Sequence, residues 1–562
     1  MNNMSVKKNI SKIFDPALVA WLAVVVVFSI IITTQHMGIS CDEGFYLMGY
    51  LKNQQIGPYS SDFHYIVRLL GRPFADNDIM VFRYMRLLLF IPSLILFSWA
   101  SYRWLTRRSE LQFKYVQIAP FVFLAGAWSY TFAAPTISYD HLQTVFYLLA
   151  LSFFFLHLAC QKRIIKILLS LTLGFVLWFG FANYPPSGVC LIFLVFVWYL
   201  IEYRKVYWQD LLSVIIGFLL AMVLHHLAIH DVKDLFSILG DTIVNVFTEK
   251  SMSRHDASGL ISTLLKVILE FLMYLLPVLA LSWLVNAKAR IPKWGQVLSV
   301  VALMGVALAF RRIYKLEGIV PLIPVMWMLG KLLANSDDRK RFLAISNIVP
   351  FVILLGLPIA GIFGSNQDLV TKAVMFAPFW IVAFFMLTGI SKERNEKVEW
   401  VFLAVLFAGY VYLGNFSRYH YYYTPRSSKK ELVGVVRNQR VLVSAYQQEY
   451  FKDVCELIRT KTGKTNPVYI GFGENQIAGY LAGGIFDGGL VYHWWQYKYN
   501  GEDKPDVFVL FKNEEQDVID EFGKLPWGFP EQYERTELRK MSENMSDELN
   551  TVIYTFKVNN NE

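Results

Sequence analysis

Long apolar runs separated by short polar segments fill the chain from residue 17 to about residue 415. A run of about 20 apolar residues spans the hydrocarbon core of a bilayer, which is about 30 Å thick. The pattern therefore predicts about thirteen transmembrane helices, at residues 17–34, 81–100, 115–133, 141–160, 164–182, 187–202, 210–229, 259–285, 296–313, 317–334, 343–362, 373–391 and 398–415.

Three segments between these runs mix aromatic and polar residues, as short helices at a membrane interface do. Two of them, residues 45–51 and 63–70, lie in the loop after the first apolar run. The third, residues 232–247, follows the seventh run. We expect interfacial helices at all three places.

The pattern changes after residue 415, where the aromatic cluster of residues 419–423 marks the exit from the membrane. Residues 443–460 have apolar positions at helical spacing, and Gly463 follows as a stop signal. Short apolar runs predict strands at residues 468–472, 507–511 and 552–558. The chain therefore has a predicted transmembrane domain, residues 1–415, and a small α/β domain, residues 416–562.

Composition supports a polytopic α-helical membrane protein, because 55% of the residues are hydrophobic and 17% are charged. The basic residues lie mostly in every second loop, so the positive-inside rule places the N-terminus in the cytoplasm and, after an odd number of helices, the C-terminal domain outside the cytoplasmic (inner) membrane. The net charge of +9 is spread over these short loops rather than one soluble face, so we exclude nucleic acid as a partner.

Charged residues gather at the predicted outer face of the membrane. The pair Asp42 and Glu43 follows the first run directly, and Asp140 with His141 stands at the start of the fourth. Asp140 can also be the N-cap of that helix. Opposite charges at one depth predict a site, although a solvated pair of loop acids is the alternative.

Three cations break the positive-inside rule in a short outer turn, namely Arg311, Arg312 and Lys315. Their position indicates an anionic ligand, and phosphate fits because arginine and lysine donors match its oxygens. Lipid head groups are the alternative ligand. Weaker candidates for the same anion are Arg72, Arg254 and His255.

Cysteine and histidine spacings show no complete set of metal ligands. His226 and His230 lie one helical turn apart, but no further ligand completes a zinc motif. Cys41 and Cys455 share the outer side in the predicted topology, which leaves a disulfide between them open. No cofactor is therefore required by the sequence.

The acidic pair in the first outer loop, directly after the first of about thirteen helices, resembles the GT-C superfamily of integral membrane glycosyltransferases. The interfacial helices and the small outer domain are similar to the bacterial transferases that attach aminoarabinose to lipid A, and the superfamily also includes the protein O-mannosyltransferases. Residues 138–140 (Ser-Tyr-Asp) and 364–367 (Gly-Ser-Asn-Gln) are similar to motifs of bacterial members. The resemblance implies transfer of a sugar from a polyprenyl-phosphate donor to a surface glycan, lipid or protein acceptor, as in lipopolysaccharide synthesis.

The resemblance also implies roles for the residues. Asp42 would be the general base for an acceptor hydroxyl, Glu43 would orient Asp42 or the acceptor, and Asp140 would be a further catalytic residue. The leaving phosphate would bind to Arg311, Arg312, Lys315 and Arg72. Further substrate contacts would come from His141, Arg254, His255 and Asn366. A divalent cation at the acidic group is compatible with a phosphate leaving group.

The alternative function is a flippase, polymerase or transporter of lipid-linked glycans, which would also need outer cations and many membrane helices. Transporters more often show internal repeats and charges near the middle of the membrane. Here the charges lie at the outer ends of the helices, which favours the enzyme.

Overall fold

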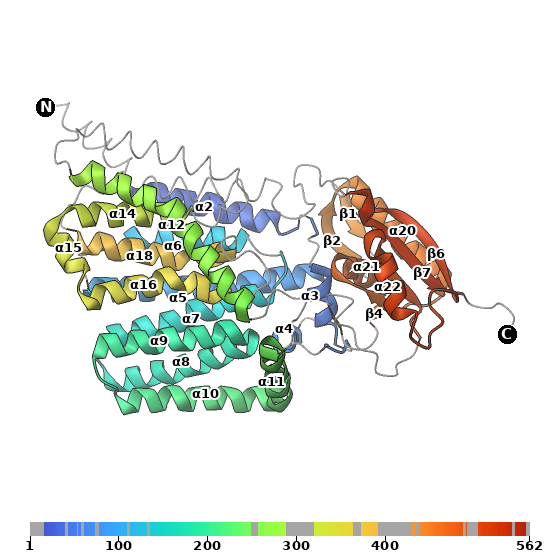
Figure 1. Ribbon diagram of the computed structural model, residues 1–562, viewed down its shortest axis with the longest axis horizontal. Coiled ribbons are helices and arrows are strands. Elements are labelled where there is room, and N and C mark those ends of the chain that lie inside the picture. The colour runs from blue at the N-terminus through green and yellow to red at the C-terminus, as the bar shows by residue number, and fades with distance from the viewer. Residues whose placement is uncertain are drawn as a thin grey trace. The chain divides into compact units, whose positions relative to one another are not determined.

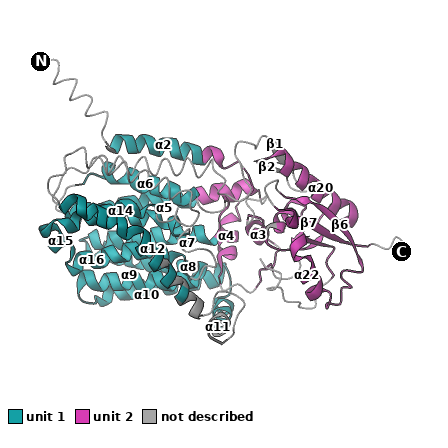
Figure 2. Cartoon of the chain, turned by 45° about the horizontal axis from the view of Figure 1, so that its top comes forward, with its two compact units in different colours: residues 1–31, 89–133, 139–413 teal, residues 32–88, 134–138, 414–562 magenta. Residues whose placement is uncertain are grey.

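The fold is described from a computed structural model of the chain (Figure 1). It describes residues 16–36, 38–39, 43–52, 54–57, 61–73, 78–108, 113–131, 135–248, 257–287, 320–363, 372–391, 430–433, 438–486, 490–491, 504–541 and 546–557. The chain forms two compact units (Figure 2). Unit 1 comprises residues 1–31, 89–133 and 139–413, and unit 2 comprises residues 32–88, 134–138 and 414–562.

Helices occupy eleven of the predicted transmembrane positions, and the other two, residues 296–313 and 398–415, lie outside the described residues. Within the described ranges, eight helices are long and apolar enough to cross a membrane, or up to nine if a bent pair counts as one span. Some of the helices in this part of the chain are too short to be among these spans. The helices, spanning or not, are α2 (Pro16–Thr34), α5 (Ile79–Arg108), α6 (Tyr115–Thr131), α7 (Tyr139–Ala159), α8 (Arg163–Asn183), α9 (Pro185–Tyr203), α10 (Trp208–Ala228), α11 (Val232–Thr248), α12 (Ala257–Ala287), α14 (Leu322–Ala334), α15 (Ser336–Phe342), α16 (Ile345–Gly361) and α18 (Ala377–Ile390), the last preceded by the 3-10 turn η2 (Ala373–Phe376).

Local signals set several of these helix ends. Pro185 begins α9, because the first turn of a helix does not need the N–H that proline lacks. Asn335 caps α15 by accepting hydrogen bonds from the backbone N–H groups of Asp337 and Asp338, at 3.0 and 3.3 Å. α15 and α16 form the bent pair, with an angle of 74° between them.

The C-terminal part of unit 2 contains a mixed five-stranded sheet in the order β4-β3-β5-β7-β6. β3 pairs in parallel with β4 and β5, and β7 pairs antiparallel with β5 and β6. The strands are β3 (Val468–Gly471), β4 (Ile485–Phe486), β5 (Val507–Phe511), β6 (Tyr533–Lys540) and β7 (Asn550–Phe556), and a separate antiparallel pair is β1 (Lys430–Val433) and β2 (Asn438–Val443). The helices are α20 (Ala445–Thr462), α21 (Gln476–Leu481) and α22 (Glu515–Phe522), with 3-10 turns η3 (Gly473–Asn475), η5 (Lys512–Glu514) and η6 (Asp547–Leu549).

The predicted fold class is confirmed: the protein is a polytopic α-helical membrane protein with a small α/β region near its C-terminus. The predicted helix of residues 443–460 is α20, and Gly463 ends it with a φ of 65°. The three predicted strands are β3, β5 and β7. β1, β2, β4 and β6 were not predicted. For β4 the reason is its length of only two residues, and for β6 it is the mostly polar sequence.

Helices form at the predicted interfacial positions, as α3 (Glu43–Tyr50), α4 (Phe63–Gly71) and α11. α3 differs from the prediction, because all its residues are buried, whereas an interfacial helix exposes one face. The reason is its packing against α21: a Cβ on Gly44 would lie 2.1 Å from the backbone nitrogen of Ile477. α3 is therefore a core helix of unit 2.

Hydrogen bonds join the first loop to the C-terminal part of unit 2 at three places. At the first, the backbone of Leu490 donates to Gln55 O and accepts from Gly57 N, each at 3.0 Å. The backbone of Leu442 in β2 donates to His36 O at 2.7 Å and accepts from Gly38 N at 2.8 Å. The side chain of Gln54 donates to Phe486 O at 3.1 Å and accepts from Phe486 N at 2.8 Å. The unit thus includes residues 32–88 besides the C-terminal part, whereas the sequence placed one boundary at residue 415, within a segment outside the described residues.

We expect Gly44→Ala to lower the free energy of unfolding by about 2 kcal/mol, because the new methyl group would push α3 away from the backbone of α21. Chemical unfolding in detergent micelles measures the change. Gly356→Ala in α16 is the matched control, since no atom lies within 4 Å of its Cβ position. An equal loss of stability in both variants would contradict the proposed close contact.

Candidate active site

A buried ion pair holds the helix that follows Asp42. Both Glu43, the first residue of α3, and Arg83, in the first turns of α5, have side chains with 0% exposure. Arg83 Nε donates to Glu43 Oε1 at 2.9 Å, and its Nη2 donates to Glu43 Oε2 at 2.7 Å. Two parallel hydrogen bonds of this kind fix both the distance and the orientation of the carboxylate. Glu43 is therefore a buried anchor, and both its oxygens are engaged by Arg83.

The same guanidinium also binds the backbone before the acidic pair. Arg83 Nη1 donates to Gln35 O and Nη2 donates to Gly38 O, each at 2.6 Å. Asp42 itself lies outside the described residues. Arg83 thus binds the chain on both sides of Asp42 in the sequence, at Gly38 before it and at Glu43 after it.

A second arginine ties down the end of α3. Arg68 in α4 donates from Nε to Gly49 O at 2.7 Å and from Nη2 to Gln54 O. His64, one turn earlier in α4, is buried, and burial together with Arg68 lowers its pKa well below the usual value. The imidazole is therefore neutral at pH 7. Its ring packs against Gly49, where a Cβ would lie 2.1 Å from His64 Nδ1. Polar contacts thus hold both short helices of the first loop, with Arg83 buried and Arg68 half-buried.

Asp140 in unit 1 belongs to a second ion pair. Its Oδ2 accepts a hydrogen bond from Lys372 Nζ at 2.9 Å, and the same ammonium donates to Tyr139 Oη at 3.1 Å. Burial by itself lowers the pKa of Lys372, but Asp140 and Tyr139 outweigh it and raise the pKa above the usual value. Lys372 is therefore charged at neutral pH.

The N-cap interpretation of Asp140 is wrong, because α7 begins at Tyr139 and places Asp140 inside its first turn. A carboxylate in the first turn still benefits from the positive end of the helix dipole. The N-cap interpretation would start the helix at residue 141, two residues later than the structure does.

Polar side chains continue from this ion pair into the helical unit. Asn183, at the end of α8, donates to Tyr139 O at 2.9 Å and to Gln143 Oε1 at 2.8 Å. Gln143 in turn donates to Ser187 Oγ at 3.0 Å. The ring of Tyr184 packs against that of Tyr139 in a tilted arrangement, with ring centroids 5.3 Å apart. These contacts fix the start of α7 against α8 and α9.

Tyr184, between α8 and α9, borders the Asp140 pair. Burial, followed by Tyr139 and Asp140, raises the pKa of its hydroxyl well above the usual value. The hydroxyl therefore keeps its proton at neutral pH and can act as a hydrogen-bond donor.

Of the remaining predicted site residues, the structure describes two, His141 and Arg72. His141 is buried, with its ring 5.9 Å from that of Phe90 and 5.4 Å from that of Tyr130, and its contact with substrate stays a prediction. Arg72 is exposed at the end of α4. The others lie outside the described residues: Asp42, Arg254, His255, Arg311, Arg312, Lys315 and Asn366.

Sequence reasoning missed both cations that bind the acids. Arg83 lies with Arg86 inside the apolar run of α5, and charges there are costly enough to require partners. Lys372 lies just before the apolar helix of residues 373–390, at the end where a cation opposes the helix dipole. Each was a detectable anomaly in the sequence, but neither anomaly identified its partner.

Metal ligands are not assembled in the part of the chain that the structure describes, where no three His, Cys, Asp or Glu side chains could hold an ion. His226 and His230 instead face acids, with His226 Nδ1 3.2 Å from Asp231 Oδ1 and His230 Nε2 3.7 Å from Asp234 Oδ2. Cys455 is buried in α20, and Cys41 lies outside the described residues.

Comparison with known proteins gives a likeness of structure without a match of sequence. No protein-family model matches the chain, and no curated protein sequence matches it. The chain is similar to the crystal structure of the Archaeoglobus fulgidus oligosaccharyltransferase tethered to an acceptor peptide with the NVT sequon, at 12% identity and a TM-score of 0.46, over 92% of this chain and 69% of that one. It is also similar to the same enzyme in complex with Zn and sulfate, at 10% identity and a TM-score of 0.47, over 96% of this chain and 73% of that one.

Proposed function

We propose that the protein is a GT-C-type glycosyltransferase, which moves a sugar from a polyprenyl-phosphate donor to a surface glycan or lipid-linked acceptor at the outer face of the cytoplasmic membrane. The observation that carries the proposal is the buried Arg83–Glu43 pair. Arg83 binds the backbone of Gly38 before Asp42 and the side chain of Glu43 after it. A general base needs such positioning, because it acts only within hydrogen-bond reach of the proton it takes.

In the proposed reaction, Asp42 takes the proton of an acceptor hydroxyl while that oxygen attacks the anomeric carbon of the donor sugar. The bond between the anomeric carbon and the phosphate oxygen breaks, and polyprenyl phosphate leaves with the electron pair. Arg311, Arg312 and Lys315, with Arg72, neutralise the charge that develops on the phosphate. The proton ends on Asp42 and passes to solvent.

Glu43 takes the first of its two expected roles in this scheme, which is to orient Asp42. Because both its oxygens accept hydrogen bonds from Arg83, it positions Asp42 instead of contacting the acceptor. A divalent cation would have to be bound without this carboxylate. Asp140 is proposed as a further substrate contact, presented by Lys372 and Tyr139 at the start of α7.

The experiment is a transfer assay in proteoliposomes with a panel of polyprenyl-phosphate sugars, comparing the wild type with Asp42→Asn. We expect the variant to transfer sugar about 100-fold more slowly or worse, since the amide cannot take a proton. Binding of the donor, measured separately, should stay unchanged. Lys52→Gln, an exposed substitution in the same loop, is the matched control.

Two outcomes would contradict the proposal. A wild-type transfer rate in Asp42→Asn would show that Asp42 is not the base. Movement of a lipid-linked glycan across the bilayer, with no sugar transferred from any donor of the panel, would favour the alternative of a flippase or transporter.

A further inference from the structure

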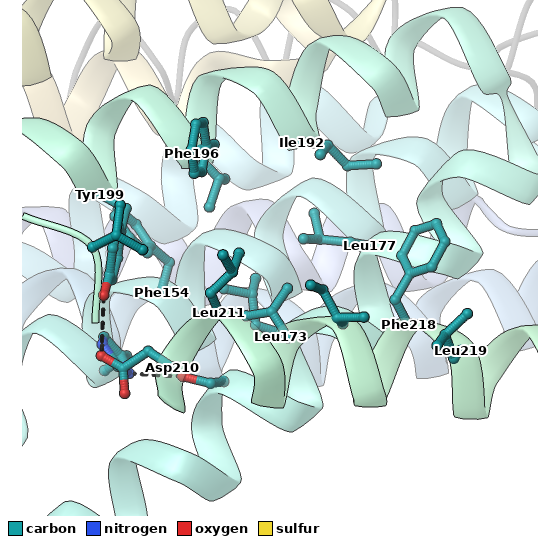
Figure 3. Close-up of a pocket in the computed structure, with 16 residues that line it drawn as sticks. Phe154, Leu173, Leu177, Ile192, Phe196, Tyr199, Asp210, Leu211, Phe218 and Leu219 are labelled. Atoms are coloured by element: carbon teal, nitrogen blue, oxygen red, sulfur yellow. Dashed lines mark hydrogen bonds and ion pairs between the residues drawn. The ribbon is translucent and has the colours of Figure 1, made fainter. Parts of the chain in front are cut away.

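A cavity of about 300 Å³ lies between α7, α8, α9 and α10, at the lower end of the size range of small-molecule sites. Its walls are almost entirely aliphatic and aromatic. Figure 3 shows Tyr199 and Asp210 at one end of the cavity and Phe218 and Leu219 at the other. A chain-like apolar molecule fits such a lining, with a polar group at one end only.

The cavity opens on the surface of unit 1, between side chains that are partly exposed. Three of the lining side chains, Phe196, Ile215 and Leu219, are 42%, 43% and 47% exposed. α9 and α10 are both candidate membrane spans, so these exposed apolar side chains face lipid. The occupant can therefore enter from the bilayer.

Two of the helices that line the cavity, α8 and α10, are closely packed against each other. A Cβ on Gly174 would lie 1.9 Å from Val214 O, and one on Gly217 would lie 1.9 Å from Leu171 O. These glycines let the backbones of α8 and α10 approach each other, as small residues do between membrane helices. The cavity is thus bounded on one side by a closely packed helix pair.

The polar end of the cavity is a network in which Asp210 is already satisfied. Tyr199 donates to Asp210 Oδ2 at 3.3 Å, and His157 Nε2 lies 3.4 Å from the same oxygen. On its other side, His157 Nδ1 lies 3.1 Å from Ser170 Oγ. The carboxylate is therefore partnered within the protein.

Basic residues surround this end of the cavity. The segments 160–166 and 202–210 carry five Lys or Arg residues against two acids, Glu202 and Asp210. Glu202 is bound to Arg108, so it does not offset the cations. Lys166 Nζ lies 3.1 Å from Tyr203 Oη, and the exposed cations are Lys162, Arg163, Arg204 and Lys205.

We propose that the cavity holds one acyl chain of an anionic phospholipid, whose phosphate binds the basic segments at the start of α8 and between α9 and α10. The lining fits the hydrocarbon, the exposed edge gives access from the bilayer, and the cations match the charge of the head group. The lipid fills space between four helices and so stabilises unit 1. This site is independent of the proposed transfer reaction.

The test uses the full-length protein in detergent with dioleoyl phosphatidylglycerol, dioleoyl phosphatidylcholine or inorganic phosphate, followed by thermal unfolding and native mass spectrometry. Phosphatidylglycerol should raise the unfolding midpoint by at least about 2 °C and stay bound, whereas the other two should not. The same shift with inorganic phosphate or with phosphatidylcholine would overturn the proposal.

Variants separate the two parts of the site. Ile192→Trp fills the cavity and should abolish the shift, while Phe193→Trp, the neighbouring exposed residue outside the lining, should leave it unchanged. Arg163 is exposed and Lys166 is half-buried. The double variant Arg163→Gln/Lys166→Gln should weaken phosphatidylglycerol binding roughly 30-fold, at about 1 kcal/mol for each charge. Arg339→Gln/Lys340→Gln on α15 is its control.

Further outcomes would also overturn the assignment. An undiminished shift in Ile192→Trp would remove the acyl chain from the cavity, and undiminished binding in Arg163→Gln/Lys166→Gln would remove the phosphate from the basic segments. Displacement of phosphatidylglycerol by a stoichiometric polyprenyl phosphate would show that the occupant is a prenyl chain.

Discussion

Replacing Arg83 with methionine is expected to lower the free energy of unfolding by about 3–5 kcal/mol, because the Glu43 carboxylate would stay buried without its cation. The variant also leaves Gln35 O and Gly38 O without their donors. Chemical unfolding in detergent micelles measures the loss. Arg459→Met, an exposed arginine of α20 in the same unit, should unfold like the wild type.

A double variant identifies the ion pair as the cause. Glu43→Leu/Arg83→Met removes both charges, so it should lose less stability than Arg83→Met alone. If the two losses are equal, the destabilisation comes from the backbone contacts of Arg83 and not from the unpaired carboxylate. Under the proposed function, transfer should be lost in both variants, because neither holds Asp42 in place.

Replacing Lys372 with methionine is expected to lower the free energy of unfolding by about 3 kcal/mol. This is the lower end of the range for broken buried ion pairs, because the Asp140 side chain is 15% exposed. Thermal and chemical unfolding of the purified protein measure the loss. Lys340→Met, at an exposed position of α15 in the same unit, is the matched control.

The variant Asp140→Asn/Lys372→Met distinguishes a structural role of Asp140 from a functional one. Removing both charges should restore most of the stability, because no unpaired charge remains. We expect sugar transfer to stay low even so, as the proposed substrate contact needs the carboxylate. Recovery of both stability and transfer would show that Asp140 only holds α7 to the segment before α18.

Local patterns in the sequence predicted most of the helical architecture. An apolar run of about 20 residues is sufficient to define a membrane helix, because the bilayer removes every alternative for its backbone. The sequence also predicted α20, because its apolar residues recur at helical spacing and Gly463 marks its end. The sequence did not predict β4 and β6. Each is a strand because it pairs with a neighbouring strand, β4 with β3 and β6 with β7, and its own composition does not indicate this.

The acidic pair shows where local patterns stop being informative. The sequence placed Asp42 and Glu43 side by side at the predicted outer face of the membrane. The tertiary structure buried Glu43 against an arginine 40 positions away, and it joined Asp140 to a lysine 232 positions away. Such pairs depend on which helices pack together, which no local spacing specifies.

The sequence by itself determined that this is a membrane protein of many helices with a small α/β region at its C-terminal end, because hydrophobic length and periodicity are properties of each segment alone. Only the tertiary structure decided that α3 is buried, that Arg83 and Lys372 neutralise the two acids, and that four helices leave an apolar cavity beside a basic end. These features arise from contacts between distant segments, whose energies depend on burial and charge in the folded chain.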